Sequence, residues 1–162
     1  MSIFMRVPGI AGETSDKNHK DCIDIIEVKF DVGRKITSAT STRGDRESSN
    51  ATISNLRLMK FMDKTTPYLF IKSCCGTGQT INIYCTKTGT GDGAEAFVEY
   101  TLENALFSKM NTEATNDNGF RPIEEYEISF TKLTTKYTPY DEDGKAVAPH
   151  VVGFDTATNT KI

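Results

Sequence analysis

Apolar and polar side chains alternate along most of this chain with a period of two, which is typical of strands that have one buried and one solvated face. The alternation predicts about seven strands, at residues 3–7, 21–31, 51–62, 81–86, 98–110, 126–131 and 147–154. A change of phase at Ser54-Asn55 predicts a bulge in the third of them. In the second, Ile26, Val28 and Phe30 should face the core, while Glu27 and Lys29 face solvent. The pattern favours a sandwich or barrel.

Residues 63–76 break this pattern and predict the single helix. Thr66 is a good N-cap residue, Pro67 suits the first helical position, and Gly76 suits the position after the last turn. Nearly every side chain between these signals is apolar, so we expect other parts of the protein to cover most of the helix surface. A helix of about nine residues does not persist alone in water, so it should lie against a sheet.

Residues 33–50 form a long polar segment, rich in Ser, Thr, Arg and Asp, with Ile36 as its one large apolar side chain. Such a segment contributes little to a core. From the sequence it is equally well explained as a disordered loop or as a functional arm.

The chain of 162 residues has 37% hydrophobic residues and a formal net charge of −3, which suit a single domain over residues 1–162. Basic and acidic residues are mixed, so no basic stripe indicates nucleic-acid binding. No apolar run is long enough to insert into a membrane, and residues 1–7 lack the features of a signal peptide. We expect a cytoplasmic protein that leaves the cell, if it does, by a route that needs no signal peptide.

Candidate chemical groups are better explained as structural. The four cysteines should be reduced thiols, with Cys74 and Cys75 as small core residues on the helix, and neither a disulfide framework nor a metal site is expected. The glycines of residues 88–93 join two strands and do not open a helix, so they predict a turn and not a phosphate loop.

The remaining polar candidates receive the same interpretation. His19 and His150 are interpreted as ordinary surface or loop residues. Glu124, Glu125 and Glu127 resemble paired carboxylates for acid–base chemistry, but they fall on a regular strand pattern in which Glu125 and Glu127 form the wet face, so a solvated face is the better explanation. We therefore expect no enzyme activity, no cofactor and no metal.

Several short motifs, in the same order, resemble the haemolysin co-regulated protein (Hcp) family, the tube subunits of the bacterial type VI secretion system. They are Ile10-x-Gly-Glu-Thr14 with Asp16 and His19, Asp63-Lys-Thr-Thr-Pro67-x-Leu69, Tyr100-x-Leu-x-Asn104, Glu127-x-x-Phe130-x-Lys132 with Tyr137, and Gly153-Phe154. The resemblance implies a mainly β fold, a β-barrel of two antiparallel or mixed sheets with one short flanking α-helix. It also implies hexameric rings that stack into a tube, a contractile sheath that expels the tube, a spike at its tip, and effectors carried or chaperoned in its lumen.

The resemblance also suggests where subunits meet, because the corresponding long loop of the family reaches toward a neighbour. Basic residues of the loop would then meet an acidic turn, in an interface formed by Arg34, Lys35, Arg43 and Arg46 with Asp141, Glu142 and Asp143. Glu27 and Lys29 are expected to face the lumen. The alternative is a monomeric β-sandwich module that binds carbohydrate, with Tyr84 or Tyr140 as a flat aromatic platform.

Overall fold

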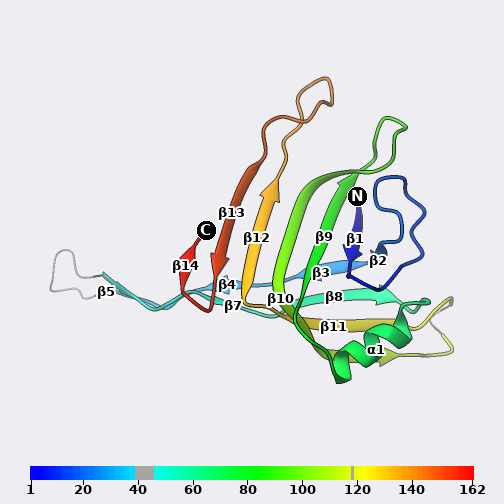
Figure 1. Ribbon diagram of the computed structural model, residues 1–162, viewed down its shortest axis with the longest axis horizontal. Helices are drawn as coiled ribbons and strands as arrows, with labels where there is room; N and C mark the ends of the chain where they lie inside the picture. Colours follow the sequence, from blue (N-terminus) through cyan, green and yellow to red (C-terminus); the bar gives the residue numbers. More distant parts are fainter. Residues whose placement is uncertain (39–45, 118) are drawn as a thin grey trace.

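Two β-sheets that share one long strand form the body of the protein, and a narrow ribbon projects from it (Figure 1). The computed structural model describes residues 1–38, 46–117 and 119–162. In the first sheet the strand order is β2 (Ile23–Ile25), β1 (Ser2–Arg6), β9 (Gln79–Lys87), β10 (Glu95–Glu113), β12 (Lys132–Tyr137), β13 (His150–Asp155) and β14 (Thr160–Lys161). In the second sheet β10 is followed by β11 (Ile123–Ser129), β8 (Leu56–Phe61) and β3 (Glu27–Lys29).

The projecting ribbon, called the arm here, consists of two short antiparallel strand pairs. β4 (Val32–Gly33) pairs with β7 (Thr52–Ile53), and further out β5 (Ile36–Ser38) pairs with β6 (Arg46–Ser48). The predicted irregularity at Ser54 and Asn55 is present, but as a break between two strands of different sheets, β7 and β8, and not as a bulge within one strand.

The 19-residue strand β10 belongs to both sheets because it turns at Asn104. A straight strand of this length would span roughly 63 Å. Its first part pairs with β9 and β12, and its last part pairs with β11. Asn104 has a φ of 51°, a left-handed conformation that asparagine tolerates better than most residues. Gly78 approaches so closely that a Cβ there would overlap the Asn104 amide.

The sheets also come together at residues 23–29, where β2 pairs with β1 in the first sheet and β3 pairs with β8 in the second. Between them the Ile26 N–H donates to the Met59 carbonyl at 2.7 Å, and the Ile26 side chain is exposed. The buried side of the strand changes here, from Ile23 and Ile25 to Val28 and the following Phe30. The predicted inward position of Ile26 is therefore wrong, because one residue is inserted between two strands.

The mainly β fold with two sheets and one helix is confirmed, and all the pairings in the described residues are antiparallel. A closed barrel is not seen in the strand pairing of these residues, since the ladder is interrupted at Ile26. The core lies between the sheets and is mostly aliphatic, with Tyr126 and Phe107 in edge-to-face contact. Its largest fully buried apolar side chains are Met5, Ile23, Leu56, Leu58, Leu69, Ile81, Ile83, Leu102, Tyr126 and Ile128.

The helix α1 (Thr66–Cys74) forms where the sequence predicts it, but with different surroundings. Its N-cap position is Thr65 and not Thr66, whose hydroxyl instead accepts from the Asp63 N–H at 3.1 Å. Leu69 alone is buried, while Tyr68, Phe70 and Ile71 are exposed. Cys74 and Cys75 are exposed as well, so their prediction as core residues is wrong. The protein covers one side of this helix only.

A buried ion network attaches the start of α1 to the second sheet. Lys60, with no exposed surface, donates through Nζ to Glu124 Oε2 at 3.2 Å, to Asp63 Oδ1 at 3.0 Å and to the Phe61 carbonyl at 2.8 Å. Tyr126 donates to the same Glu124 oxygen at 2.9 Å, and burial together with the Glu124 charge raises the pKa of Tyr126. Glu124 is thus buried, on the face of β11 opposite to Glu125 and Glu127, where it serves as a structural partner of Lys60.

We predict that Lys60→Met lowers the free energy of unfolding by about 3–5 kcal/mol, because it leaves carboxylates buried without a cation. The double variant Lys60→Met/Glu124→Leu should lose less, since it removes charge on both sides. Urea unfolding measures both, and Lys29→Met, which removes an exposed ion pair, is the control and should cost under about 1 kcal/mol. Equal losses for Lys60→Met and Lys29→Met would contradict the network's role.

Candidate assembly surface

The arm carries basic residues away from the body (Figure 1). Residues 33–50, which the sequence left as a disordered loop or an arm, form paired strands in their described part. Lys35 and Ser49 are joined twice at 2.8 Å, from the Lys35 N–H to the Ser49 hydroxyl and from the Ser49 N–H to the Lys35 carbonyl. Arg34 and Lys35 are both exposed, and Arg46 is the first residue of β6. Arg43 lies outside the described residues.

The acidic turn, Asp141, Glu142 and Asp143, lies at the tip of the connection between β12 and β13 (Figure 1). Asp141 Oδ1 accepts from the Asp143 N–H at 3.0 Å and from the Lys145 N–H at 2.8 Å, so the turn has a defined shape. At its base, Lys87 Nζ lies 3.4 Å from the centre of the Tyr140 ring. The three acidic side chains are exposed. The arm and this turn project from different ends of the molecule, so one chain does not bring the predicted interface residues together.

The outer face of the second sheet is charged and solvated. Lys29 and Glu27 of β3 pair with each other at 3.4 Å. On the neighbouring strands, Arg57 Nε lies 3.5 Å and Lys109 Nζ lies 4.0 Å from Glu127 Oε1. The wet-face prediction for Glu27 and Lys29 is correct, and they belong to a band of alternating charge that crosses four strands.

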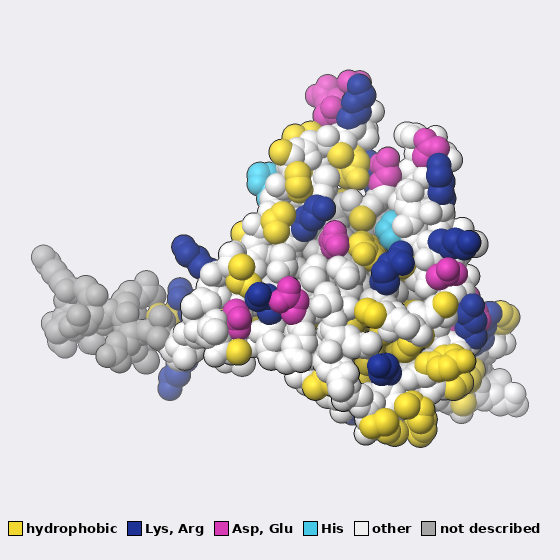
Figure 2. All heavy atoms as spheres, viewed as in Figure 1, with side chains coloured by type: hydrophobic (Ala, Val, Ile, Leu, Met, Phe, Trp, Pro, Cys, Tyr) yellow, Lys and Arg dark blue, Asp and Glu magenta, His cyan; other side chains and the backbone are white. Residues whose placement is uncertain are grey.

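The outer side of α1 is apolar and was not anticipated as a surface. Figure 2 shows hydrophobic side chains gathered at the lower right, where Figure 1 draws this helix. Tyr68, Phe70 and Ile71 are 64%, 53% and 54% exposed. The sequence did carry a sign of this surface. The helix is apolar on nearly every side, and such a helix is normally covered on every side.

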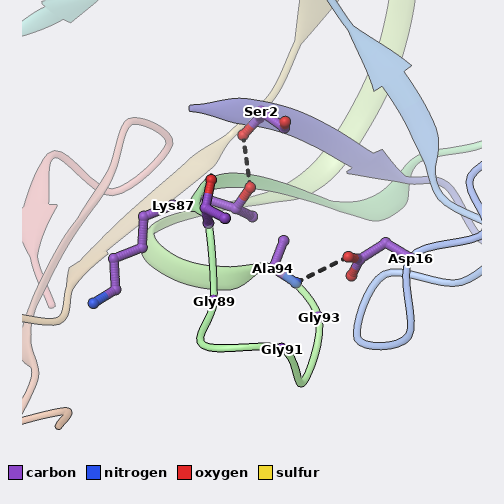
Figure 3. Close-up of a pocket in the computed structure, with 9 residues that line it drawn as sticks. Ser2, Asp16, Lys87, Gly89, Gly91, Gly93 and Ala94 are labelled. Carbon is purple, nitrogen blue, oxygen red and sulfur yellow. Dashed lines mark hydrogen bonds between the residues drawn. The ribbon is translucent and has the colours of Figure 1, made fainter. Parts of the chain in front are cut away.

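A hollow of about 320 Å³ beside the glycine-rich turn between β9 and β10 is the clearest small-molecule candidate (Figure 3). Its polar groups already bond within the chain: Asp16 Oδ2 accepts from the Ala94 N–H at 2.9 Å, and the Thr86 hydroxyl donates to the Ser2 carbonyl at 3.1 Å. The residues confirm a turn between strands, as predicted, and they hold the turn in place without converging on a ligand.

Asp16 joins the loop after β1 to this turn. Its Oδ1 contacts His19 Nδ1 at 3.1 Å and accepts from the Asn18 N–H at 3.0 Å. The hydrogen bond from Ala94, followed by that from His19, lowers the pKa of Asp16 below its ordinary 3.8. His19 itself is buried, stacked on Phe4 at 4.9 Å with Tyr84 at its edge. His19 therefore lies in a loop, as predicted, but it is packed inside the protein and is not a surface histidine.

No group of His, Cys, Asp and Glu in the described residues is arranged to hold a metal ion. All four cysteines are free thiols. Burial raises the pKa of the Cys22 and Cys85 thiols, which makes them poor nucleophiles. No helix in the part of the chain that the structure describes is long and apolar enough to cross a membrane.

The fold and these surfaces define a two-sheet β protein with one helix, a projecting arm and surfaces suited to protein contacts. The family described as "Type VI secretion system effector, Hcp" matches residues 4–137, so the chain belongs to the Hcp family. No curated protein sequence matches the chain closely enough to count as a relative.

Solved structures share the fold over almost the whole chain. A structure described as that of a type six secretion system protein has a TM-score of 0.90 at 23% identity, covering 99% of both chains. Hcp1 from Salmonella typhimurium has a TM-score of 0.76 at 20% identity, covering 99% of this chain and 98% of its own. A type VI secretion system effector from Yersinia pestis has a TM-score of 0.72 at 21% identity, covering 94% and 98%.

We predict that Asp16→Asn lowers the free energy of unfolding by about 1 kcal/mol at pH 7. Because the folded-state pKa of Asp16 is depressed, its charge stabilises the fold above the unfolded pKa of 3.8, and this stabilisation is lost as the pH falls through the folded value. Urea unfolding from pH 7 downward should show the gap between variant and parent closing below about pH 3.8. Asp92→Asn, at a side chain 91% exposed, is the control and should show little gap at any pH. A gap for Asp16→Asn that does not change with pH would contradict this account.

Proposed function

We propose that this protein is a tube subunit of a type VI secretion system, whose copies close into hexameric rings that stack into a tube expelled by a contractile sheath. The observation that carries the proposal is the family match over residues 4–137. Its partners would be other copies of itself, the sheath, the spike at the tip and effectors in the lumen. The role is structural and not enzymatic, and it is performed by residues 1–162 as a single domain.

The shape of the molecule supports self-assembly. A contact between two different surfaces of identical subunits gives a ring if its rotation closes, and a filament if it does not. The arm and the acidic turn are such a pair of surfaces. They have opposite charge and lie at different ends of one folded molecule. Contact between Arg34 or Lys35 and the Asp141–Asp143 turn of a neighbour would satisfy charges that make no ion pair within the described residues.

The charged outer face of the second sheet suits a hydrated lumen. Its ion pairs are exposed and individually weak, so they contribute little to folding. A wall of alternating Lys, Arg and Glu presents no large apolar area to which a passing protein would stick. Glu27 and Lys29 would lie on this wall, where effectors move or are chaperoned.

The alternative, a carbohydrate-binding module, requires a free aromatic platform. The Lys87 ammonium lies over one face of the Tyr140 ring, and the Tyr84 ring is half-buried in an edge-type contact with His19. Neither ring is fully exposed, which does not favour a flat aromatic platform for a sugar. Localisation follows the tube proposal: the protein would be made in the cytoplasm and secreted through the machine without a signal peptide.

The function is tested by the assembly state of the purified protein. Native mass spectrometry should show hexamers, and negative-stain microscopy should show rings. Size-exclusion chromatography with light scattering over a wide concentration range serves as the independent measurement. A monomer at every concentration, with a folded circular dichroism spectrum, would contradict the tube proposal and favour a binding module.

Charge reversal tests the arm contact. Arg34→Glu/Lys35→Glu should weaken ring formation, and adding Asp141→Lys/Asp143→Lys in the same chain should restore it, because each subunit supplies both surfaces. The defect of the first variant should be largest at low salt, since salt screens such pairs in the parent as well. Lys20→Glu, also exposed but away from the arm, is the control. Failure of the second pair to restore assembly at any ionic strength would show that these groups do not meet.

A further inference from the structure

An apolar groove lies between the base of the arm and the edge of the first sheet. One side is formed by Phe30, Val32 and Ile53, and the other by Leu133, Val152 and Phe154. The groove has a volume of about 230 Å³, and none of the described residues that line it is charged. Val32 and Val152 are 62% and 68% exposed, so the described part of the chain leaves this groove open.

The outer side of α1 is the complementary feature. Lys72 is the only charged residue of this nine-residue helix, and the other exposed positions include Tyr68, Phe70 and Ile71. At 100° per residue, Ile71 and Cys74 point away from the buried Leu69, with Tyr68 and Phe70 on the two flanks. The helix therefore presents a convex apolar face with aromatic edges.

We propose that the outer face of α1 docks into this groove on a second copy of the chain. The proposal rests on the proposed function, for which it names the main subunit contact. Within one chain the two surfaces cannot meet, because α1 and the strands of the groove lie at opposite ends of the body (Figure 1). Each copy therefore offers its helix to one neighbour and its groove to another, which is the arrangement that a ring requires.

Size and charge both favour a second copy as the occupant. An apolar cavity of about 150 Å³ is enough to hold benzene, so the groove has room for the ring of Phe70 or Tyr68. Asp31 stands between Phe30 and Val32 at the rim, and Lys72 lies one turn after Tyr68 on the flank of the helix. Neither forms an ion pair within the described residues, and opposite charges at a rim steer association and fix register.

Substitutions on each surface test the contact in the full-length protein. Ile71→Asp and Val152→Asp should each raise the subunit concentration needed for half-assembly by about tenfold or more, because each places an unpaired charge in an apolar contact. Both positions are exposed in the subunit, so circular dichroism and thermal melting should be unchanged. Val151→Asp is the matched control: Val151 is 54% exposed on the same strand, but its side chain points to the opposite face of the sheet.

Thiol reactivity gives a second readout that needs no substitution on the helix. Cys74 and Cys75 are exposed on and directly after α1, while Cys22 is buried inside the subunit. Alkylation followed by peptide mass spectrometry should show Cys74 reacting about tenfold or more slowly in assembled protein than in the Val152→Asp variant, and Cys22 protected in both.

The outcomes separate this proposal from the tube proposal. If the parent forms rings while Ile71→Asp and Val152→Asp assemble equally well, or if Cys74 is equally reactive in both states, the helix-to-groove contact is wrong and the tube function stands. An assembly defect in Val151→Asp as large as that in Val152→Asp would also overturn the helix-to-groove contact. A parent that never assembles overturns both proposals.

Discussion

The arrangement of this protein depends on a single buried cation. Lys60 is the last inward-facing residue of β8. Its ammonium has no access to water, so it must donate its hydrogen bonds to oxygen atoms of the protein. Glu124 supplies one oxygen from β11, and Asp63 supplies another from the turn that leads into α1. The Asp63 carboxylate also accepts from the Thr65 N–H at 2.8 Å. The start of the helix is thereby fixed to the sheet, and this decides which of its apolar sides is left outside.

The bend of β10 gives the two sheets different outer characters. Before Asn104 the strand serves the first sheet, whose strand β13, next to the last strand β14, carries exposed valines. After Asn104 it serves the second sheet, whose outer face carries paired charges. An apolar surface can bury area and supply affinity, whereas exposed ion pairs supply little free energy but keep a wall hydrated. One strand thus separates a face suited to docking from a face suited to a lumen.

The sequence predicts most of the strands because their dry faces repeat every second residue, as in Ile81 and Ile83. β12 is missed because Leu133 is its one buried apolar residue among Lys, Thr and Tyr. The Lys60–Glu124 pair did have a signal, since each residue continues a buried alternation, after Leu56 and Leu58 and before Tyr126 and Ile128. The exposure of Ile71 could not be predicted, because periodicity shows that a face is apolar but not which molecule covers it.

A subunit that assembles must also stay soluble before it meets its neighbours. Large apolar patches on a monomer invite aggregation, and this chain divides its patch between a convex helix face and a separate concave groove. Like surfaces fit each other poorly: two helices meet convex against convex, and two grooves leave a gap. In the proposed assembly, the same division that limits non-specific association would make the helix-to-groove contact directional, and the charges at the arm and the acidic turn would select the orientation. Affinity and orientation would then come from different residues, so salt should affect the orientation of subunits in the proposed assembly more than its apolar contact.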